Sequence, residues 1–201
     1  MQFHPGIFST EQLLKLTVST QQLFSNHPST TNNNYRNISN VLYFGCCRDY
    51  SKNPYELEAT KHIAAQSWID HNKNIFNQVN DLFKKFIPEL FHRYSSIPLP
   101  KRHFGAFATV AVNKLSNNGI ALHQDVKDYK NGYCWIVPFG KFDGGNFLLK
   151  DINVTVPLQA ADIMCLQSTK RHQVKPFEGF RFSLVFFSHH NLFYYNGNQM
   201  F

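Results

Sequence analysis

Three groups of residues in the second half of the chain carry side chains that can bind a metal ion or an anion. His123 and Asp125 are separated by one residue, and His172 comes much later in the chain. In a strand, residues i and i+2 point to the same face, so the imidazole and the carboxylate can meet one ion. Two histidines and one carboxylate on one side of a metal leave open positions opposite them. This donor set is typical of non-haem Fe(II) oxygenases.

The third group is Arg181-Phe182-Ser183, which follows His172 on a later apolar run. The period of two places Arg181 and Ser183 on one face and the neighbouring phenylalanines on the other. An arginine that enters a buried site needs an anion, because an unpaired buried charge is costly. A carboxylate suits the planar guanidinium, with a hydroxyl alongside. The C5 carboxylate of 2-oxoglutarate meets this need, and its 2-oxo acid end would chelate the iron.

Each of these features has a plainer interpretation when it is taken alone. His123 would more often be structural, His172 would pair with Asp162 or face solvent, and Arg181 would lie on the surface. The joint match of residue types, spacing and strand parity favours the iron site over these alternatives. A zinc or manganese site on such a scaffold would use further histidines. The remaining candidates lack a spacing that ties them to this face: His62, His92, His103, His189 and His190.

Short apolar runs separated by glycines and prolines follow Pro98 and must position these groups. Eight runs are expected as strands, at 104–113, 119–123, 133–139, 146–149, 152–156, 162–166, 172–175 and 180–187. They leave no room for crossover helices, so the sheet should be mainly antiparallel, as in a jelly roll. In that fold the second and seventh strands can lie side by side. This arrangement would bring His172 next to His123.

The first half of the chain is expected to support this core. We predict one catalytic domain over 1–201, with an N-terminal arm and loop at 1–50, supporting helices at 51–95 and a jelly-roll core at 96–193. Residues 20–40 are rich in Ser, Thr and Asn and predict a loop. Asn53-Pro54 is a candidate helix start, and Pro88 should kink or restart the helix. The fold class is therefore α+β and β-dominated, a double-stranded β-helix with a helical region packed against it.

Composition and sequence pattern argue against a disordered chain, a membrane-spanning protein and a secreted protein. Of the 201 residues, 43% are hydrophobic and only 16% are charged, which indicates a globular chain. The load of 20 phenylalanines favours a β-rich core. The sequence contains neither an apolar run long enough to cross a bilayer nor a secretory signal pattern. With four cysteines and no such signal, we expect reduced thiols and an intracellular location, nuclear or cytoplasmic, not secreted.

The net charge of +7 favours a polyanionic partner. Basic residues surround the expected mouth of the site, and they are candidate contacts to the phosphates of a nucleic acid. The candidates are Lys127, Lys130, Lys170 and Arg171. An ordinary solvated basic face explains them equally well. Tyr129, Tyr133 and Trp135 can stack on a base, although aromatic residues in strands more often belong to the core.

The stretches HQDVKDYKNGYCWIVPFGKFDGGNFLLK and RHQVKPFEGFRFSLVFF resemble the JBP/TET-like 2-oxoglutarate dioxygenases, particularly their fungal branch. The resemblance covers about residues 104–190, and its narrower marks are Asp128, Asn131-Gly132, Gly140 and Gly144-Gly145. It implies His123, Asp125 and His172 as iron ligands. It also implies Arg181, assisted by Ser183, as the 2-oxoglutarate site, and Asn113 as a further polar contact. The chain departs from the family at Ala161-Asp162, where Gly-Asp is usual.

The resemblance implies oxidation of the methyl group of 5-methylcytosine or thymine in nucleic acid, preferentially DNA. It requires iron(II), 2-oxoglutarate and O2, with ascorbate as a candidate stimulant. Two alternatives remain open, namely the same chemistry on a protein side chain or small molecule, and a non-catalytic jelly-roll binding module. No membrane and no protein partner is expected.

Overall fold

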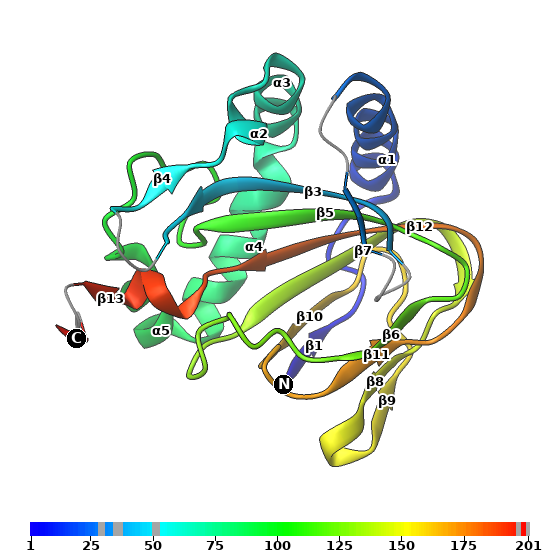
Figure 1. Ribbon diagram of the computed structural model, residues 1–201. Coiled ribbons are helices and arrows are strands. Elements are labelled where there is room, and N and C mark those ends of the chain that lie inside the picture. The colour runs from blue at the N-terminus through cyan, green and yellow to red at the C-terminus, as the bar shows by residue number, and fades with distance from the viewer. Residues whose placement is uncertain (28–30, 34–37, 50–52, 196–197, 200–201) are drawn as a thin grey trace.

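Two antiparallel sheets form the centre of the structure, and helices cover one face of the larger sheet (Figure 1). The computed structural model describes residues 1–27, 31–33, 38–49, 53–195 and 198–199. Its larger sheet has the order β1-β10-β7-β12-β5-β3-β2, with β4 paired to β3, and its smaller sheet has the order β6-β11-β8-β9.

The strands of the larger sheet are β1 (Gln2–His4), β2 (Thr31–Asn33), β3 (Ile38–Cys47), β4 (Tyr55–Glu56), β5 (Thr109–Leu115), β7 (Cys134–Gly144), β10 (Ile163–Leu166) and β12 (Phe177–Phe187). The smaller sheet contains β6 (Ile120–His123), β8 (Phe147–Leu149), β9 (Val154–Val156) and β11 (His172–Val174). The helices are α1 (Thr10–Asn26), α2 (Glu58–Lys61), α3 (Ile63–His71), α4 (Lys73–Phe86) and α5 (Pro88–Ser95). Two 3₁₀ turns, η2 (Lys150–Ile152) and η3 (His190–Phe193), and the pair β13 (Tyr194–Tyr195) and β14 (Asn198–Gln199) complete the described elements.

The antiparallel jelly-roll prediction is confirmed. All eight expected strands are present, as β5 to β12. The second and seventh of them, β6 and β11, pair directly. The strand β12 separates two cores because alternate side chains point to opposite faces. Phe182, Leu184 and Phe186 pack between the sheet and the helices, whereas Phe187 packs between the two sheets.

The helix α4 packs its apolar stripe against the larger sheet, as its spacing predicts. Its buried residues are Ile75, Phe76, Val79 and Phe83. Pro88 stands at the first turn of α5, so it restarts the helix. Asn53-Pro54, by contrast, does not start a helix, because β4 intervenes and the first helix of this region begins at Glu58. Among the described residues, no helix has the length and apolar character needed to span a bilayer.

The N-terminal 50 residues contribute more than the expected arm and loop. A capping box closes the start of α1, where the Ser9 hydroxyl accepts from the Gln12 N–H and the Gln12 side chain accepts from the Ser9 N–H. The strand β1 extends the sheet beside β10, and β3 pairs with β5 along most of its length. The loop expected at 20–40 is therefore corrected at both ends, by α1 and β3. Residues 28–30 and 34–37 of it lie outside the described residues.

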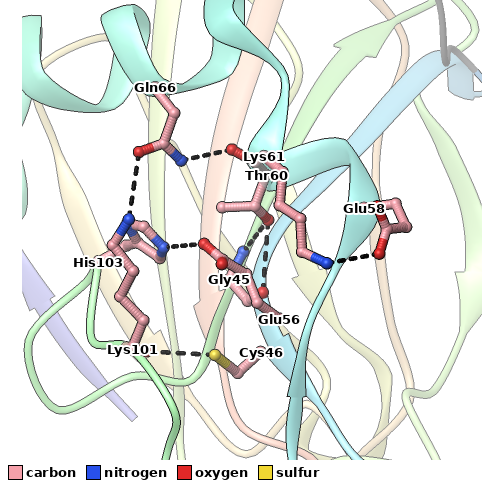
Figure 2. Close-up of polar contacts among 9 residues, drawn as sticks. All are labelled: Gly45, Cys46, Glu56, Glu58, Thr60, Lys61, Gln66, Lys101 and His103. Carbon is pink, nitrogen blue, oxygen red and sulfur yellow. Dashed lines mark hydrogen bonds and ion pairs between the residues drawn. The ribbon is translucent and has the colours of Figure 1, made fainter.

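A polar network connects β3 and β4 to the helices and to the segment before β5 (Figure 2). His103 Nε2 and Glu56 Oε1 form a largely buried hydrogen bond at 2.5 Å. The Thr60 hydroxyl accepts from the Gly45 N–H at 2.7 Å, and the Cys46 thiol donates to the Lys101 carbonyl at 3.2 Å. These contacts hold β3 against the part of the chain that leads into β5.

Candidate metal centre and adjoining pocket

The pairing of β6 with β11 brings the three predicted ligands together. His123 and His172 are direct cross-strand partners, and their ring centroids lie 4.2 Å apart. Asp125 follows the end of β6, and one of its oxygens lies 3.7 Å from His172 Nε2. One ligand atom from each of the three residues lies within 4.8 Å of the others. The group can therefore hold a single metal ion.

Hydrogen bonds to the main chain fix the orientation of both imidazoles. His123 Nδ1 lies 2.8 Å from the Ala121 carbonyl, and His172 Nδ1 lies 2.7 Å from the Lys170 carbonyl. A carbonyl oxygen only accepts, so each Nδ1 carries a proton, and each Nε2 is the ring atom left to bind a metal. Phe147 stacks on the His172 ring at an interplanar angle of 13°. These contacts are the usual outer support of histidine ligands.

Arg181 is buried in the same cavity, with an exposed fraction of 2%. Its guanidinium donates to the Gly145 carbonyl at 2.6 Å and lies over the Phe142 ring, but its buried Nε has no hydrogen-bond partner. Burial lowers the pKa of Arg181 to about 10. The side chain is therefore still a cation at neutral pH, and within the described part of the chain no carboxylate pairs with it.

The two polar residues predicted beside Arg181 lie next to each other. Ser183 on β12 and Asn113 on β5 are cross-strand partners, and the Asn113 amide donates to the Ser183 hydroxyl at 3.3 Å. Both are buried, and both line the cavity. Further odd-numbered residues also line the cavity, namely Val185 and Phe187 on β12 and His189 just past its end.

The cavity has a volume of about 490 Å³ and extends beyond the metal ligands and Arg181 to a second polar group, Asp128 with His189. Asp128 accepts from the Ser168 hydroxyl at 2.5 Å. His189 Nε2 lies 3.9 Å from Asp128 Oδ1, and His189 Nδ1 lies 3.9 Å from the Cys47 thiol. Burial, with help from Lys127 and His190, lowers the pKa of His189 to about 4, so its ring is neutral at pH 7.

Sequence reasoning set His189 aside, yet it belongs to this site. It lies two residues past the end of β12, where it continues the odd-numbered series that begins at Arg181 and Ser183, and this spacing could have identified it. Tyr129 and Trp135 are buried in the helix-side core, so their plainer interpretation as core residues is correct.

The four basic residues predicted to contact phosphates differ in their surroundings. Lys127 is exposed and lines the cavity, and Lys170 is exposed next to the metal centre, where its carbonyl accepts from His172. Lys130 is also exposed. Arg171 forms an exposed ion pair with Asp151 at 2.7 Å, and its hydrogen bonds lower the pKa of that carboxyl. The charge of Arg171 is therefore partly compensated within the chain.

Comparisons with known proteins identify the fold. No family model and no curated protein sequence matches the chain. Among solved structures, NgTET1 in complex with 5mC DNA matches 98% of this chain and 73% of its own, with a TM-score of 0.76 and 16% identity. OsALKBH1 matches 92% of this chain and 96% of its own, with a TM-score of 0.53 and 13% identity. An oxidoreductase of the 2OG-Fe(II) oxygenase family from Burkholderia pseudomallei matches 90% and 79%, with a TM-score of 0.52 and 14% identity. The chain thus has the double-stranded β-helix fold of the 2OG-Fe(II) oxygenases.

Proposed function

We propose that this chain is an iron(II)- and 2-oxoglutarate-dependent dioxygenase, and that it oxidises the methyl group of 5-methylcytosine or thymine in nucleic acid. The observation that carries the chemistry is one cavity that contains both a His-Asp-His group and a buried guanidinium, with which no carboxylate of the described residues forms an ion pair. Either feature alone occurs in many proteins. Their combination fits a metal bound together with a dicarboxylate.

The donor set fits iron(II). Two neutral imidazoles, each presenting Nε2, and one carboxylate are the facial triad of non-haem iron oxygenases, which leaves the opposite positions for other ligands. When bound, iron(II) with 2-oxoglutarate supplies a strong oxidant generated from O2. His123, Asp125 and His172 would hold the ion, and their main-chain contacts keep them in place without rearrangement.

The surroundings of Arg181 fit the distal carboxylate of 2-oxoglutarate. A guanidinium prefers a carboxylate through paired N–H donors, and such a pair is strong where water is excluded. Arg181 has a donor without a partner, and Ser183 and Asn113 add polar atoms beside it. Phe147 in the cavity wall would shield the co-substrate from water, and the Phe142 ring supports the Arg181 guanidinium.

The second polar group in the cavity supports a nucleobase as substrate. Asp128 presents carboxylate oxygens, which accept hydrogen bonds from an exocyclic amine such as that of cytosine. The neutral ring of His189 can offer one donor or one acceptor. An enzyme that acts on a base must admit it to a pocket of this kind, with contacts to the edge of the base. The likeness to NgTET1, which extends over nearly the whole chain and was seen with 5mC DNA, adds support for this substrate class. The place near the fungal JBP/TET-like branch rests on the sequence resemblance.

Exposed basic residues support nucleic acid as the carrier of that base, since Lys127 lines the cavity and Lys170 lies next to the metal centre. Replacing Lys127, Lys130 and Lys170 together with Gln should weaken DNA binding and flatten its salt dependence by roughly 0.7–0.9 for each phosphate that is no longer neutralised. Arg171→Gln should change the slope less, because Asp151 already compensates its charge. Iron and 2-oxoglutarate affinity should not change in either variant. Equal slopes for the wild type and the triple variant would make these lysines an ordinary solvated face.

The decisive experiment is mass spectrometry of nucleosides from methylated and unmethylated DNA incubated with the protein, Fe(II), ascorbate and 2-oxoglutarate. We expect oxidised 5-methylcytosine or oxidised thymine, and none with Arg181→Ala. Turnover of 2-oxoglutarate that responds only to peptides or metabolites would move the substrate to a protein side chain or small molecule. Absence of metal-dependent 2-oxoglutarate turnover would make the chain a binding module.

A further inference from the structure

Ser168 connects the metal centre to the second polar group of the cavity. It lies between β10 and β11 and is 3% exposed. Its hydroxyl donates to Asp128 Oδ2 at 2.5 Å, and its carbonyl accepts from the Asp125 N–H at 2.8 Å. One residue therefore holds the main chain of a proposed iron ligand and the side chain of the carboxylate that lines the substrate part of the cavity.

The Ser168 hydroxyl contributes to the orientation of the Asp128 carboxylate. The terminal torsion of an aspartate is broad, so the plane of the carboxylate is set by its hydrogen bonds. The main chain around it is already fixed, since the Asp128 N–H donates to the Asp125 carbonyl and Asp128 forms a β-bridge with His189. Ser168 adds the side-chain contact to Oδ2, while Oδ1 faces His189 Nε2 at 3.9 Å. Asp128 and His189 both line the cavity, so a polar edge of a ligand that enters it can reach both side chains.

We propose that Ser168 is a positioning residue that makes the site select an amine-bearing pyrimidine over a keto-bearing one. By occupying Oδ2, its hydroxyl fixes the direction in which Oδ1 accepts. The exocyclic amine of 5-methylcytosine donates to such an oxygen, whereas the O4 of thymine is an acceptor and would face it with like polarity. This inference rests on the proposed function, because it requires a base to enter the cavity.

The chain offers a matched control for the loss of a buried serine hydroxyl. Ser168→Ala keeps the carbonyl that holds Asp125 and removes only the hydroxyl. Ser188 is also buried, at 1% exposed, and its hydroxyl accepts from the Ala108 N–H at 3.0 Å without a contact to Asp128. Ser188→Ala therefore reports what a missing buried hydrogen bond does to the fold alone.

The test is binding of fluorescent single-stranded oligonucleotides that differ only in one central base, 5-methylcytosine or thymine. It is measured by anisotropy without O2, in the presence of Fe(II) and 2-oxoglutarate. We expect Ser168→Ala to reduce the preference for 5-methylcytosine roughly 5- to 10-fold, as loss of one hydrogen bond to a charged group allows. Ser188→Ala should keep the preference. In an Asp128→Asn background, Ser168→Ala should cause no further loss.

The proposal would be overturned by an unchanged preference in Ser168→Ala, by an equal loss in Ser188→Ala, or by no preference in the wild type. An additive loss in the Asp128→Asn background would also contradict it, because Ser168 would then act elsewhere. The assay involves no turnover, so it tests the role of Ser168 separately from the proposed dioxygenase activity. Preferential binding without oxidation would refute only the proposed function, whereas oxidation together with a base preference that is unchanged in Ser168→Ala would refute only this inference.

Discussion

Gly145 sets the position of the Arg181 guanidinium, and one methyl group there should displace it. Gly145 has a φ of +67°, and its carbonyl accepts from Arg181 Nη1. A Cβ added to Gly145 would lie 2.1 Å from the same Nη1. Gly145→Ala is therefore a way to move the guanidinium without removing its charge.

The expected loss of 2-oxoglutarate affinity follows from the distance between the added Cβ and Arg181 Nη1. Ordinary contact begins at 3.4 Å, so the guanidinium must retreat by about 1.3 Å or Gly145 must shift by as much. A displacement of that size breaks a directed hydrogen bond, which weakens steeply with distance and angle. Loss of one hydrogen bond to a charged group costs roughly 1.5–3 kcal/mol, which corresponds to about 10- to 100-fold weaker 2-oxoglutarate binding.

Gly144→Ala is the matched control. Gly144 also has a positive φ, +82°, so an alanine there carries similar backbone strain. Its Cβ would meet the Pro176 carbonyl at 3.2 Å and would not approach Arg181. Calorimetric titration with 2-oxoglutarate in the presence of metal should show the loss only in Gly145→Ala. Equal affinities in the two variants would refute the claim that Arg181 binds the co-substrate at its present position.

Three further predictions concern stability and the metal. Ala161 has a φ of +76°, a backbone conformation that costs an L-residue roughly 1–2 kcal/mol. Ala161→Gly removes this strain, and after the entropy cost of glycine is subtracted the melting temperature should rise by roughly 1–4 °C. An unchanged or lower melting temperature would contradict this. The pKa of His189, about 4 against an ordinary 6.5, means that the unfolded chain binds more protons between these values. The free energy of unfolding should therefore fall by up to about 1.4 kcal/mol per pH unit as pH drops from 6.5 towards 4, and His189→Asn should remove that slope in urea titrations. His172→Ala should abolish tight Fe(II) binding in an anaerobic titration while far-UV circular dichroism stays unchanged, and retained binding would exclude His172 as a ligand.

Periodicity predicted the part of the fold that surrounds the proposed metal centre. The alternation in the last strand placed Arg181 and Ser183 opposite the phenylalanines, and the packing of β12 agrees. The pairing of β6 with β11 followed from strand order alone, because short antiparallel strands admit few arrangements. The same parity would have included His189, whose distance along the chain from the other histidines gave no indication of a shared site.

The N-terminal elements were harder to predict because their stability comes from tertiary contacts. The helix α1 is largely polar and buries few large apolar side chains, chiefly Leu16 and Leu23, so its stripe is weak. The strand β3 is buried on both faces over Val41, Leu42 and Phe44, and the period-two alternation that marks a half-exposed strand is therefore absent. The contact between Ser168 and Asp128 joins residues far apart in the chain, and no local pattern indicates it.

The two-sided packing of β12 also restricts how its length can change during evolution. Deletion of one residue in the middle of the strand would exchange its two faces. The residues that share a face with Arg181 would then point towards the helices, and the phenylalanines would point into the cavity. Such a change would remove the proposed co-substrate site and the helix-side core in one step. Deletion of two residues would preserve the faces, although it would shift the register against β5 and β7. Insertions and deletions among related chains should therefore be rare within β12, and those that occur there should come in pairs.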